Sequence, residues 1–243
     1  MERVDKILAG MGLGSRKEIK ALVKQGAVVI NGVICKDPGD KIDVERDEVS
    51  VSGRMLRLRT TYTFMMHKPA GYLSASRDDR DVTVIELLSE EHRRLGLFPA
   101  GRLDKDSEGL LILTNDGPFA HALTAPRRHV DKLYEIRYDG VLRESAEAEF
   151  AAGIAIDGGE TCLEAELCRT APGEALVTVH EGRYHQVKRM IAACGGEVTY
   201  LKRLRIGPLP LDEGLLPGEY RELTDGELSA LRAACGIDRE ESR

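Results

Sequence analysis

The sequence predicts an α+β fold, with a small N-terminal domain followed by a larger one. Three observations support this. A chain of 243 residues is long enough for two unequal domains. Its first fifty residues have the pattern of two short helices followed by small strands. Beyond them, strand-like runs and helical segments alternate too irregularly for βαβ repeats, which favours a mixed, mostly antiparallel sheet flanked by helices.

The N-terminal domain, predicted over residues 1–53, opens with two helices. The first carries an apolar stripe with the spacing i, i+3, i+4, i+7, formed by Val4, Ile7, Leu8 and Met11. The second begins at a capping box, in which Ser15 and Glu18 satisfy each other's backbone donors. A β-hairpin is predicted over residues 28–34, because the pair Asn31-Gly32 is typical of its turn.

The chain after this domain is divided into three parts. Residues 54–61 carry spaced basic side chains and are predicted to be a linker, 62–236 the second domain, and 237–243 a polar tail. Strands are predicted at 64–67, 110–114, 133–138, 163–168 and 175–180. Helices are predicted at 82–88, 144–152, 184–193 and, after a capping box at Thr224, up to Cys235.

Composition and missing motifs exclude several classes of protein. No window approaches 18 consecutive apolar residues, and the N-terminus lacks a signal-peptide core, so we expect a cytoplasmic protein with no membrane contact. The five cysteines show no CxxC spacing, which argues against a structural metal site. No phosphate-binding glycine motif is present, so we expect no nucleotide cofactor and no other cofactor.

The charge is unevenly distributed along the chain. The net charge is −6, yet residues 1–36 contain seven basic against three acidic side chains, and residues 181–205 contain six against two. Two basic segments in an acidic chain are compatible with local phosphate contacts. A basic helix face is more often simply solvated, so this observation alone is only suggestive.

The segment 101–117 carries the strongest candidate for chemistry. Asp104 lies in a charged loop just before the apolar run 110–113, and Gly109 leads the chain into that strand. A carboxylate held at the end of a rigid strand can serve as a nucleophile or a general base. Taken alone, the segment is more simply interpreted as a solvated loop of mixed charge.

Five motifs in order change that interpretation. The loop at 101–117 resembles the catalytic motif of pseudouridine synthases, in the branch typified by ribosomal small-subunit pseudouridine synthase A. The matching segments are 68–72, 101–117, 132–135, 181–190 and 217–223, and the resemblance runs from about Met1 to about Cys235. The N-terminal domain resembles the RNA-binding domain of the ribosomal-protein-S4 type.

The resemblance implies a reaction that needs neither a metal nor a cofactor. Asp104 would attack the nucleotide covalently, at the base or at the sugar. Lys188 would keep this carboxylate ionised against desolvation, although by itself it is more simply a surface lysine. Tyr134, by itself a core aromatic, would stack on the target uracil and is suited to proton transfer at its carbon 5.

The remaining expectations concern RNA contacts and substrate. Arg102 would fill the gap left by the flipped nucleotide, and the other expected RNA-binding residues are Arg3, Lys6, Ser15, Arg16, Lys17, Lys20, Arg183, His185 and Gln186. The last two are equally compatible with a structural role. The expected function is isomerisation of a uridine in 16S ribosomal RNA, within a small-subunit assembly particle. Two alternatives stay open: the same reaction on 23S RNA, and a non-catalytic ribosome assembly factor.

Overall fold

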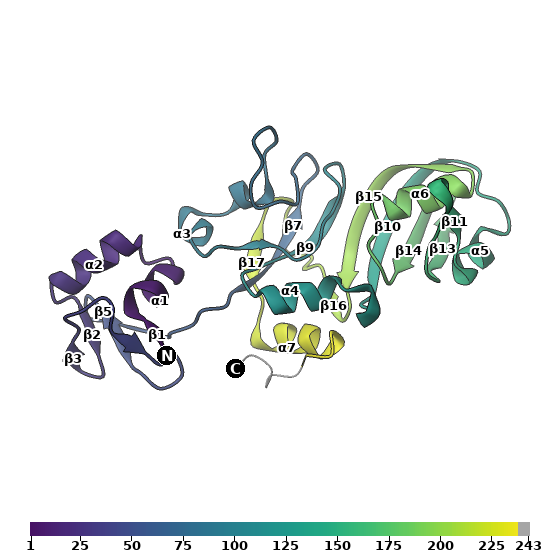
Figure 1. Ribbon diagram of the computed structural model, residues 1–243. Coiled ribbons are helices and arrows are strands. Elements are labelled where there is room, and N and C mark those ends of the chain that lie inside the picture. The colour runs from purple at the N-terminus through teal and green to yellow at the C-terminus, as the bar shows by residue number, and fades with distance from the viewer. Residues whose placement is uncertain (238–243) are drawn as a thin grey trace. The chain divides into compact units, whose positions relative to one another are not determined.

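The computed structural model describes residues 1–237 and divides into two compact units (Figure 1). Unit 1 comprises Met1–Tyr62 and Leu88–Leu97. Unit 2 comprises Thr63–Leu87 and the chain from Phe98 onward. Of the predicted polar tail 237–243, residues 238–243 lie outside the described residues. The predicted α+β class is confirmed in both units.

Unit 1 combines helices with a small antiparallel sheet. Its helices are α1 (Val4–Gly10), α2 (Arg16–Lys24) and α3 (Glu90–Arg93). Its four-stranded sheet has the order β3 (Val33–Ile34), β2 (Val28–Ile30), β5 (Val49–Val51) and β6 (Arg54–Leu56), and β1 (Glu2–Arg3) pairs with β4 (Lys41–Ile42). The capping box at Ser15 is confirmed, as is the 28–34 hairpin, whose turn residues Asn31 and Gly32 both have positive φ.

The first part of the predicted linker differs from the structure. Arg54–Leu56 forms β6 and pairs with β5 across a tight turn at Ser52 and Gly53, which have φ angles of 52° and 81°. Two successive positive φ angles are characteristic of the hairpin turn that matches strand twist. The Ser-Gly pair was the available signal, and the spaced arginines were mistaken for linker composition.

Unit 2 is built on a mixed, mostly antiparallel sheet, which among residues 1–237 contains nine strands. Its main path has the order β13 (Glu166–Ala171), β14 (Glu174–Val179), β10 (Lys132–Gly140), β15 (Gly196–Ile206), β9 (Glu108–Thr114), β7 (Thr63–Lys68) and β17 (Tyr220–Glu222). Two short strands, β16 (Leu209–Pro210) and β8 (Phe98–Pro99), pair with β15 and β9.

Two apolar cores lie on this sheet. Helices α5 (Ala146–Ala152) and α6 (Gln186–Ala193) contribute to the core around β10, β13 and β14, and α4 (Gly117–Thr124) and α7 (Asp225–Ala234) to the core around β7 and β9 (Figure 1). The smaller elements are η1 (Val84–Leu87), η2 (Pro126–Arg128), η3 (Asp157–Gly159), β11 (Ala155–Ile156) and β12 (Glu160–Thr161).

The two halves of the sheet meet at one short parallel contact between β9 and β15. It consists of the pairs Lys202–Glu108 and Arg203–Gly109. The second pair is unusually close, because a Cβ atom built on Gly109 would lie 2.2 Å from the Arg203 carbonyl oxygen. Gly109 also has a φ of 105°, a conformation that side chains rarely adopt. Glycine is therefore required where the Asp104 loop enters the sheet.

The longest strand of unit 2 was missed by the sequence prediction. Residues 196–206 form β15, whereas the sequence analysis treated this region only as a basic segment. Two further elements differ in detail: 82–88 contains the 3₁₀ turn η1, and α6 begins at Gln186 because His185 is left-handed, with a φ of 49°. Among the described residues no helix is long and apolar enough to cross a membrane.

Replacing Gly109 by Ala is expected to destabilise unit 2 severely. The added methyl group would overlap the Arg203 backbone and force an unfavourable φ, so we expect a loss of about 3 kcal/mol or more in the free energy of unfolding. Urea denaturation measures this loss. Gly117→Ala is the matched control, because nothing lies within 4 Å of a Cβ there, and it is expected to be neutral. Equal stability of the two variants would contradict the tight β9–β15 contact.

Candidate active site

A cavity of about 600 Å³ opens in unit 2 where the two apolar cores meet. Leu103, Tyr134 and Val187 line it from the first core, and Leu123 and Ile206 from the second. Asp104, Lys188 and Arg102 also line it, so the sequence-predicted catalytic residues share one cavity. The cavity thus combines apolar walls with many charged and polar side chains, as a site for a polar, partly aromatic group requires.

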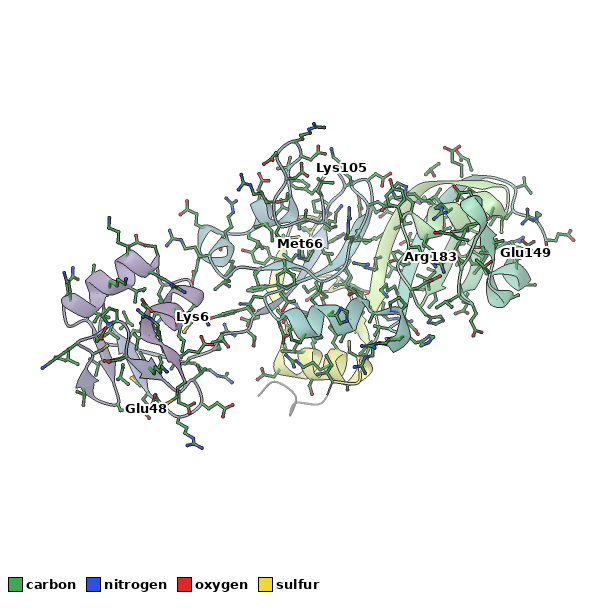
Figure 2. All side chains as sticks on the ribbon, viewed as in Figure 1. Lys6, Glu48, Met66, Lys105, Glu149 and Arg183 are labelled. Carbon is green, nitrogen blue, oxygen red and sulfur yellow. The ribbon has the colours of Figure 1, made fainter. Side chains whose placement is uncertain are left out.

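A buried lysine holds the backbone of the loop that carries Asp104. Lys68 is 0% exposed, and its ammonium group donates to the carbonyl oxygens of Pro69, Lys105 and Ser107 at 3.0, 3.3 and 2.7 Å. Burial is the main cause that lowers the pKa of Lys68 to about 8. Lys105, labelled in Figure 2, therefore belongs to a loop whose backbone is fixed on both sides of Asp106.

Hydrogen bonds between Ser74 and Leu103 hold the loop on the other side of Asp104. The Ser74 hydroxyl donates to the Leu103 carbonyl at 2.9 Å, and the Leu103 amide donates back to the Ser74 oxygen at 3.0 Å. The backbone is thus held immediately before Asp104 and shortly after it. Such support fixes a reactive carboxylate within a narrow range of positions.

Asp104 faces two basic side chains from α6 and the residue preceding it. Lys188 Nζ lies 3.4 Å from Asp104 Oδ2, and His185 Nε2 lies 3.6 Å from Oδ1. The Asp104 side chain is 27% exposed, so water reaches it from the cavity mouth. Val187, Met190, Ile191 and Cys194 are buried, as the predicted packing stripe requires, and this leaves Lys188 directed at the loop.

Lys188 makes its shortest contacts with a second carboxylate. Its Nζ donates to both oxygens of Asp106, at 2.6 and 2.7 Å. Burial acts to raise the pKa of Asp106, but the hydrogen bond and charge of Lys188 outweigh it, so this pKa lies below its usual value. One lysine is therefore shared between two carboxylates, a feature that the sequence analysis did not anticipate.

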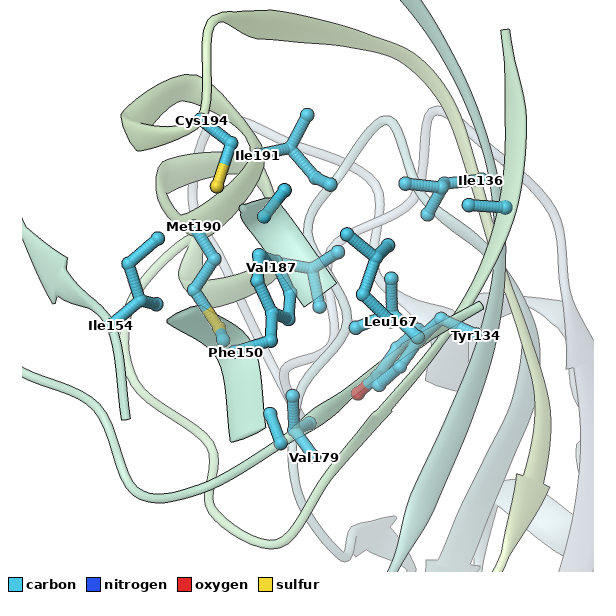
Figure 3. Packing of buried hydrophobic residues seen from close by; sticks show 14 of the residues in the cluster. Tyr134, Ile136, Phe150, Ile154, Leu167, Val179, Val187, Met190, Ile191 and Cys194 are labelled. Carbon is cyan, nitrogen blue, oxygen red and sulfur yellow. The ribbon is translucent and has the colours of Figure 1, made fainter. Parts of the chain in front are cut away.

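Tyr134 projects from β10 into the first core and reaches the cavity. It is 8% exposed and lies in the cluster with Leu167, Val179 and Val187 (Figure 3). Tyr134, Ile136 and Tyr138 are buried on one face of β10, as the predicted alternation requires. Its hydroxyl accepts a hydrogen bond from Arg203 Nη1 at 3.4 Å. The ring can thus present one face to a planar ligand while its hydroxyl is held.

The segment before α6 is built around a buried polar network. The Gln186 amide nitrogen donates to Glu181 at 3.1 Å, and its oxygen accepts from the Arg183 backbone at 2.9 Å. Arg183, labelled in Figure 2, also donates to Glu181 at 2.9 Å. Gln186 is 5% exposed, so the structure places it where its amide serves the protein itself. His185 stacks on the exposed Tyr184, with ring centroids 3.8 Å apart.

The other sequence-predicted RNA contacts fall into two groups. Arg3 pairs with the buried Asp5 at 2.9 Å and Lys6 with Glu2 at 2.8 Å, and the Ser15 hydroxyl caps α2. By contrast, four exposed basic side chains make no ion pair with any residue from 1 to 237: Arg16, Lys17, Lys20 and Arg102. The second group is the one available to phosphates.

Three buried charged residues of the cavity were missed by the sequence analysis as site residues: Lys132, Glu181 and Arg203. Lys132 belongs to a motif quoted for the resemblance, but only Tyr134 was taken from it. Arg203 lies on the missed strand β15, and an isolated buried arginine has no signature in a sequence. Within the described part of the chain, no group of His, Cys, Asp or Glu side chains could hold a metal ion.

Lys132 carries its positive charge in a buried position. It is 8% exposed, donates to the Val130 carbonyl at 3.0 Å, and has no carboxylate partner among residues 1–237. Burial, followed by the charge of Arg203, lowers its pKa to about 8. Because an unfolded lysine titrates near 10.5, the unfolded chain binds more protons between these values. The loss of folding stability caused by burying this charge is therefore full below pH 8 and disappears as the pH rises toward 10.5.

Lys132→Met is therefore expected to stabilise the protein at pH 7. The variant no longer buries an unpaired ammonium, and we expect a gain of about 1–3 kcal/mol in the free energy of unfolding. Urea denaturation of both proteins at pH 7 and pH 10 measures it. The difference in the free energy of unfolding should shrink at pH 10, because the wild-type Lys132 is then neutral in the folded state. The titration of Lys68 contributes equally to both proteins and does not affect this difference. A variant less stable at pH 7 would contradict this assignment.

Comparison with known proteins relates both units to one class of enzyme. The pattern of the RNA pseudouridylate synthase family matches residues 62–193, and that of the S4 domain matches residues 2–49. An uncharacterized RNA pseudouridine synthase of Bacillus subtilis is 47% identical, over 94% of this chain and 98% of its own length. Ribosomal small subunit pseudouridine synthase A of Vibrio cholerae is 39% identical, over 94% and 99%.

Two further similarities complete the comparison. Ribosomal large subunit pseudouridine synthase B of Bacillus subtilis is 36% identical, over 96% of each chain. A solved structure described as a pseudouridylate synthase aligns with a TM-score of 0.67 and 36% identity, over 95% of this chain and 100% of that one. The chain thus resembles relatives named for either ribosomal subunit across nearly their entire length.

Proposed function

Because the chain belongs to the RNA pseudouridylate synthase family, we propose that it isomerises one uridine of ribosomal RNA, with Asp104 as the nucleophile. The observation that carries the proposal is the placement of Asp104 on a cavity of about 600 Å³, with Lys188 Nζ 3.4 Å from its carboxylate. Tyr134 lies on the same cavity. Family membership leaves no reason to retain the non-catalytic assembly factor as a candidate.

Asp104 is proposed to bond covalently to the target nucleotide. The reaction breaks the bond between uracil N1 and ribose C1′, turns the ring, and joins its C5 to C1′. A carboxylate attacks only while it is ionised, and a cation near it opposes the neutralising effect of burial. Lys188 supplies that cation, and the braces from Lys68 and Ser74 hold the loop in position.

The cavity can accept only a nucleotide taken out of the RNA stack. Tyr134 is proposed to stack on the extruded uracil, which contributes about 1–3 kcal/mol and offsets much of the cost of flipping. Arg102 is exposed beside Asp104 and makes no ion pair with a described residue, so its side chain is free to occupy the vacated position in the RNA. Tyr134 would then contact the flipped base, and Arg102 the position in the RNA that the base has left.

The proposed substrate is small-subunit ribosomal RNA, within a partly assembled particle in the cytoplasm. Similarity over nearly full length to the small-subunit enzyme of Vibrio cholerae supports it. The second candidate is large-subunit RNA, favoured by the 36% identity to the large-subunit enzyme of Bacillus subtilis. The two candidates share the chemistry and differ only in the RNA that is bound.

The S4 domain of unit 1 is proposed to supply affinity through Arg16, Lys17 and Lys20. The triple variant with Gln at these positions should bind RNA more weakly, and the slope of log K against log salt should fall by about 2. A salt titration of binding measures both. Arg169→Gln is the control, because this arginine already pairs with Glu147. An unchanged slope in the triple variant would assign the anchoring to another surface.

Release of tritium from RNA labelled at uridine C5 tests the function, because forming the new bond expels that hydrogen. The substrates are 16S RNA, 23S RNA and small-subunit assembly particles. We expect release of one equivalent from the small-subunit substrates. Release from 23S RNA alone would select the second candidate. Tight binding to all three without any release would contradict the proposed function.

A further inference from the structure

Two buried cations line the cavity without an ion pair to a described residue, although the charges of Asp131 and Glu181 act on Lys132 from beyond contact distance. Arg203 is 2% exposed and Lys132 is 8% exposed, and neither forms an ion pair with a residue in the described range 1–237. Buried charges are normally paired, because an unpaired one is costly. The acidic residues of the site do not fill this role, since Asp104 and Asp106 contact Lys188 and Glu181 contacts Arg183 and Gln186.

The guanidinium of Arg203 is held in place by hydrogen bonds, but one of its nitrogen atoms has no acceptor among the residues described. Its Nε donates to the Leu110 carbonyl at 2.7 Å, and its Nη1 donates to the Tyr134 hydroxyl at 3.4 Å. Nη2 is buried and has no hydrogen-bond partner in the described structure. The close Arg203–Gly109 backbone pair fixes the start of this side chain. One donor of a positioned cation therefore lacks an acceptor.

Arg203 lies close to Tyr134, the residue on which the uracil is proposed to stack. The Arg203 Cζ atom lies 5.9 Å from the centroid of the Tyr134 ring. A uracil held against Tyr134 would lie close to this guanidinium, and its carbonyl oxygens would be suitable acceptors for Nη2. Lys132 lines the same cavity and uses one of its three protons on Val130.

We propose that Arg203, assisted by Lys132, is a catalytic residue that stabilises the negative charge of the uracil ring while it is detached from the ribose. The inference rests on the proposed function. When the N1–C1′ bond breaks, its electron pair remains on the ring and spreads to the carbonyl oxygens. C5 then bonds to C1′, the bond between Asp104 and the nucleotide breaks to release the carboxylate, the C5 proton leaves, and N1 takes up a proton, so the reaction is balanced without a co-reactant.

The electrostatics of the cavity agree with this role. After burial, the charge of Arg203 is the largest cause that lowers the pKa of Lys132, so the two cations repel each other. An anion formed there relieves the repulsion between the cations. Fixed charges aimed at the site where charge develops stabilise a transition state more than a ground state. The cost of the unpaired cations in the free protein thus becomes a gain during the reaction.

The test compares the full-length wild type with Arg203→Gln and Arg203→Lys in single-turnover reactions. RNA containing 5-fluorouridine at the target is the second substrate, because fluorine withdraws electrons and makes the detached ring a weaker base. Arg203→Gln is expected to consume uridine about 10²–10³-fold more slowly, with RNA affinity unchanged. The factor by which Arg203→Gln slows the reaction of 5-fluorouridine RNA should be at least about tenfold smaller than the factor for uridine RNA. Arg203→Lys keeps the charge and should recover most of the rate on uridine.

Arg232→Gln is the matched control for losing a mostly buried arginine in unit 2. Arg232 pairs with Asp116 on the second core and lines no part of the catalytic cavity. This variant should be less stable, yet its rates on the two substrates should keep the wild-type ratio. If Arg203→Gln does not fold, Lys132→Met takes its place, with the same pattern on the two substrates expected at a smaller amplitude.

Two results would overturn the inference. An equal loss on both substrates would show that Arg203 serves only to hold Tyr134 and the sheet, and an undiminished rate would show that it has no role. Either result leaves an active wild-type enzyme. Failure of the proposed function would differ, because the wild type itself would then convert no uridine.

Discussion

Asp104→Asn is expected to abolish pseudouridine formation while leaving RNA binding nearly unchanged. The substitution keeps the size of the side chain and most of its hydrogen bonding, but removes the negative charge that a nucleophile requires. We expect a rate at least about 10⁴-fold below wild type, as for other covalent nucleophiles removed from otherwise intact sites. Tritium release and a filter-binding titration measure the two quantities on the same RNA.

Asp106→Asn is the natural companion to this variant. Asp106 lies two residues further along the loop, contacts the same Lys188 and is mostly exposed. Its amide variant should retain substantial activity, because Lys188 can then move closer to Asp104. Comparable activity in the Asp104 and Asp106 variants would refute the assignment of the nucleophile to Asp104.

Lys188→Met is expected to cause the second largest loss, on the order of 10²–10³-fold at pH 7. Two neighbouring carboxylates would then share no ammonium group, and their mutual repulsion would favour protonation of one of them as the pH falls. The residual activity should therefore rise with pH, which a merely structural defect would not produce. The activity–pH profile of the purified variant is the measurement.

Lys188→Arg provides the control for charge. A guanidinium can span both Asp104 and Asp106, so this variant should keep the wild-type shape of the profile and lose less than about tenfold in rate. Equal activities of the Met and Arg variants over the whole profile would exclude a role for the positive charge.

Local sequence rules predicted the elements that depend on local chemistry. The capping boxes at Ser15 and Thr224 set the starts of α2 and α7, and the Asn31-Gly32 turn set the 28–34 hairpin. Strand β15 was missed because its residues mix charged and apolar side chains, and its burial is created by neighbours far away in the sequence. Tertiary contacts, not periodicity, define such a strand.

The site residues also divide into those that local motifs predict and those that depend on contacts made in the fold. Asp104, Tyr134 and Lys188 could be named because they lie in contiguous motifs, and the structure brings all three to one cavity. The sharing of Lys188 with Asp106 depends on a rotamer and a distance that no motif encodes. Arg203 could not be recognised, because its significance comes from burial and from an unused donor, which only the folded chain reveals.

Mapping pseudouridines in ribosomal RNA tests the central claim most directly. The comparison uses cells lacking this protein and the same cells supplied with the wild type or with Asp104→Asn. We expect one pseudouridine of the small-subunit RNA to disappear without the protein, to return with the wild type, and to stay absent with the Asp104 variant. An unchanged pseudouridine map in the cells lacking the protein, or full restoration by Asp104→Asn, would contradict the account.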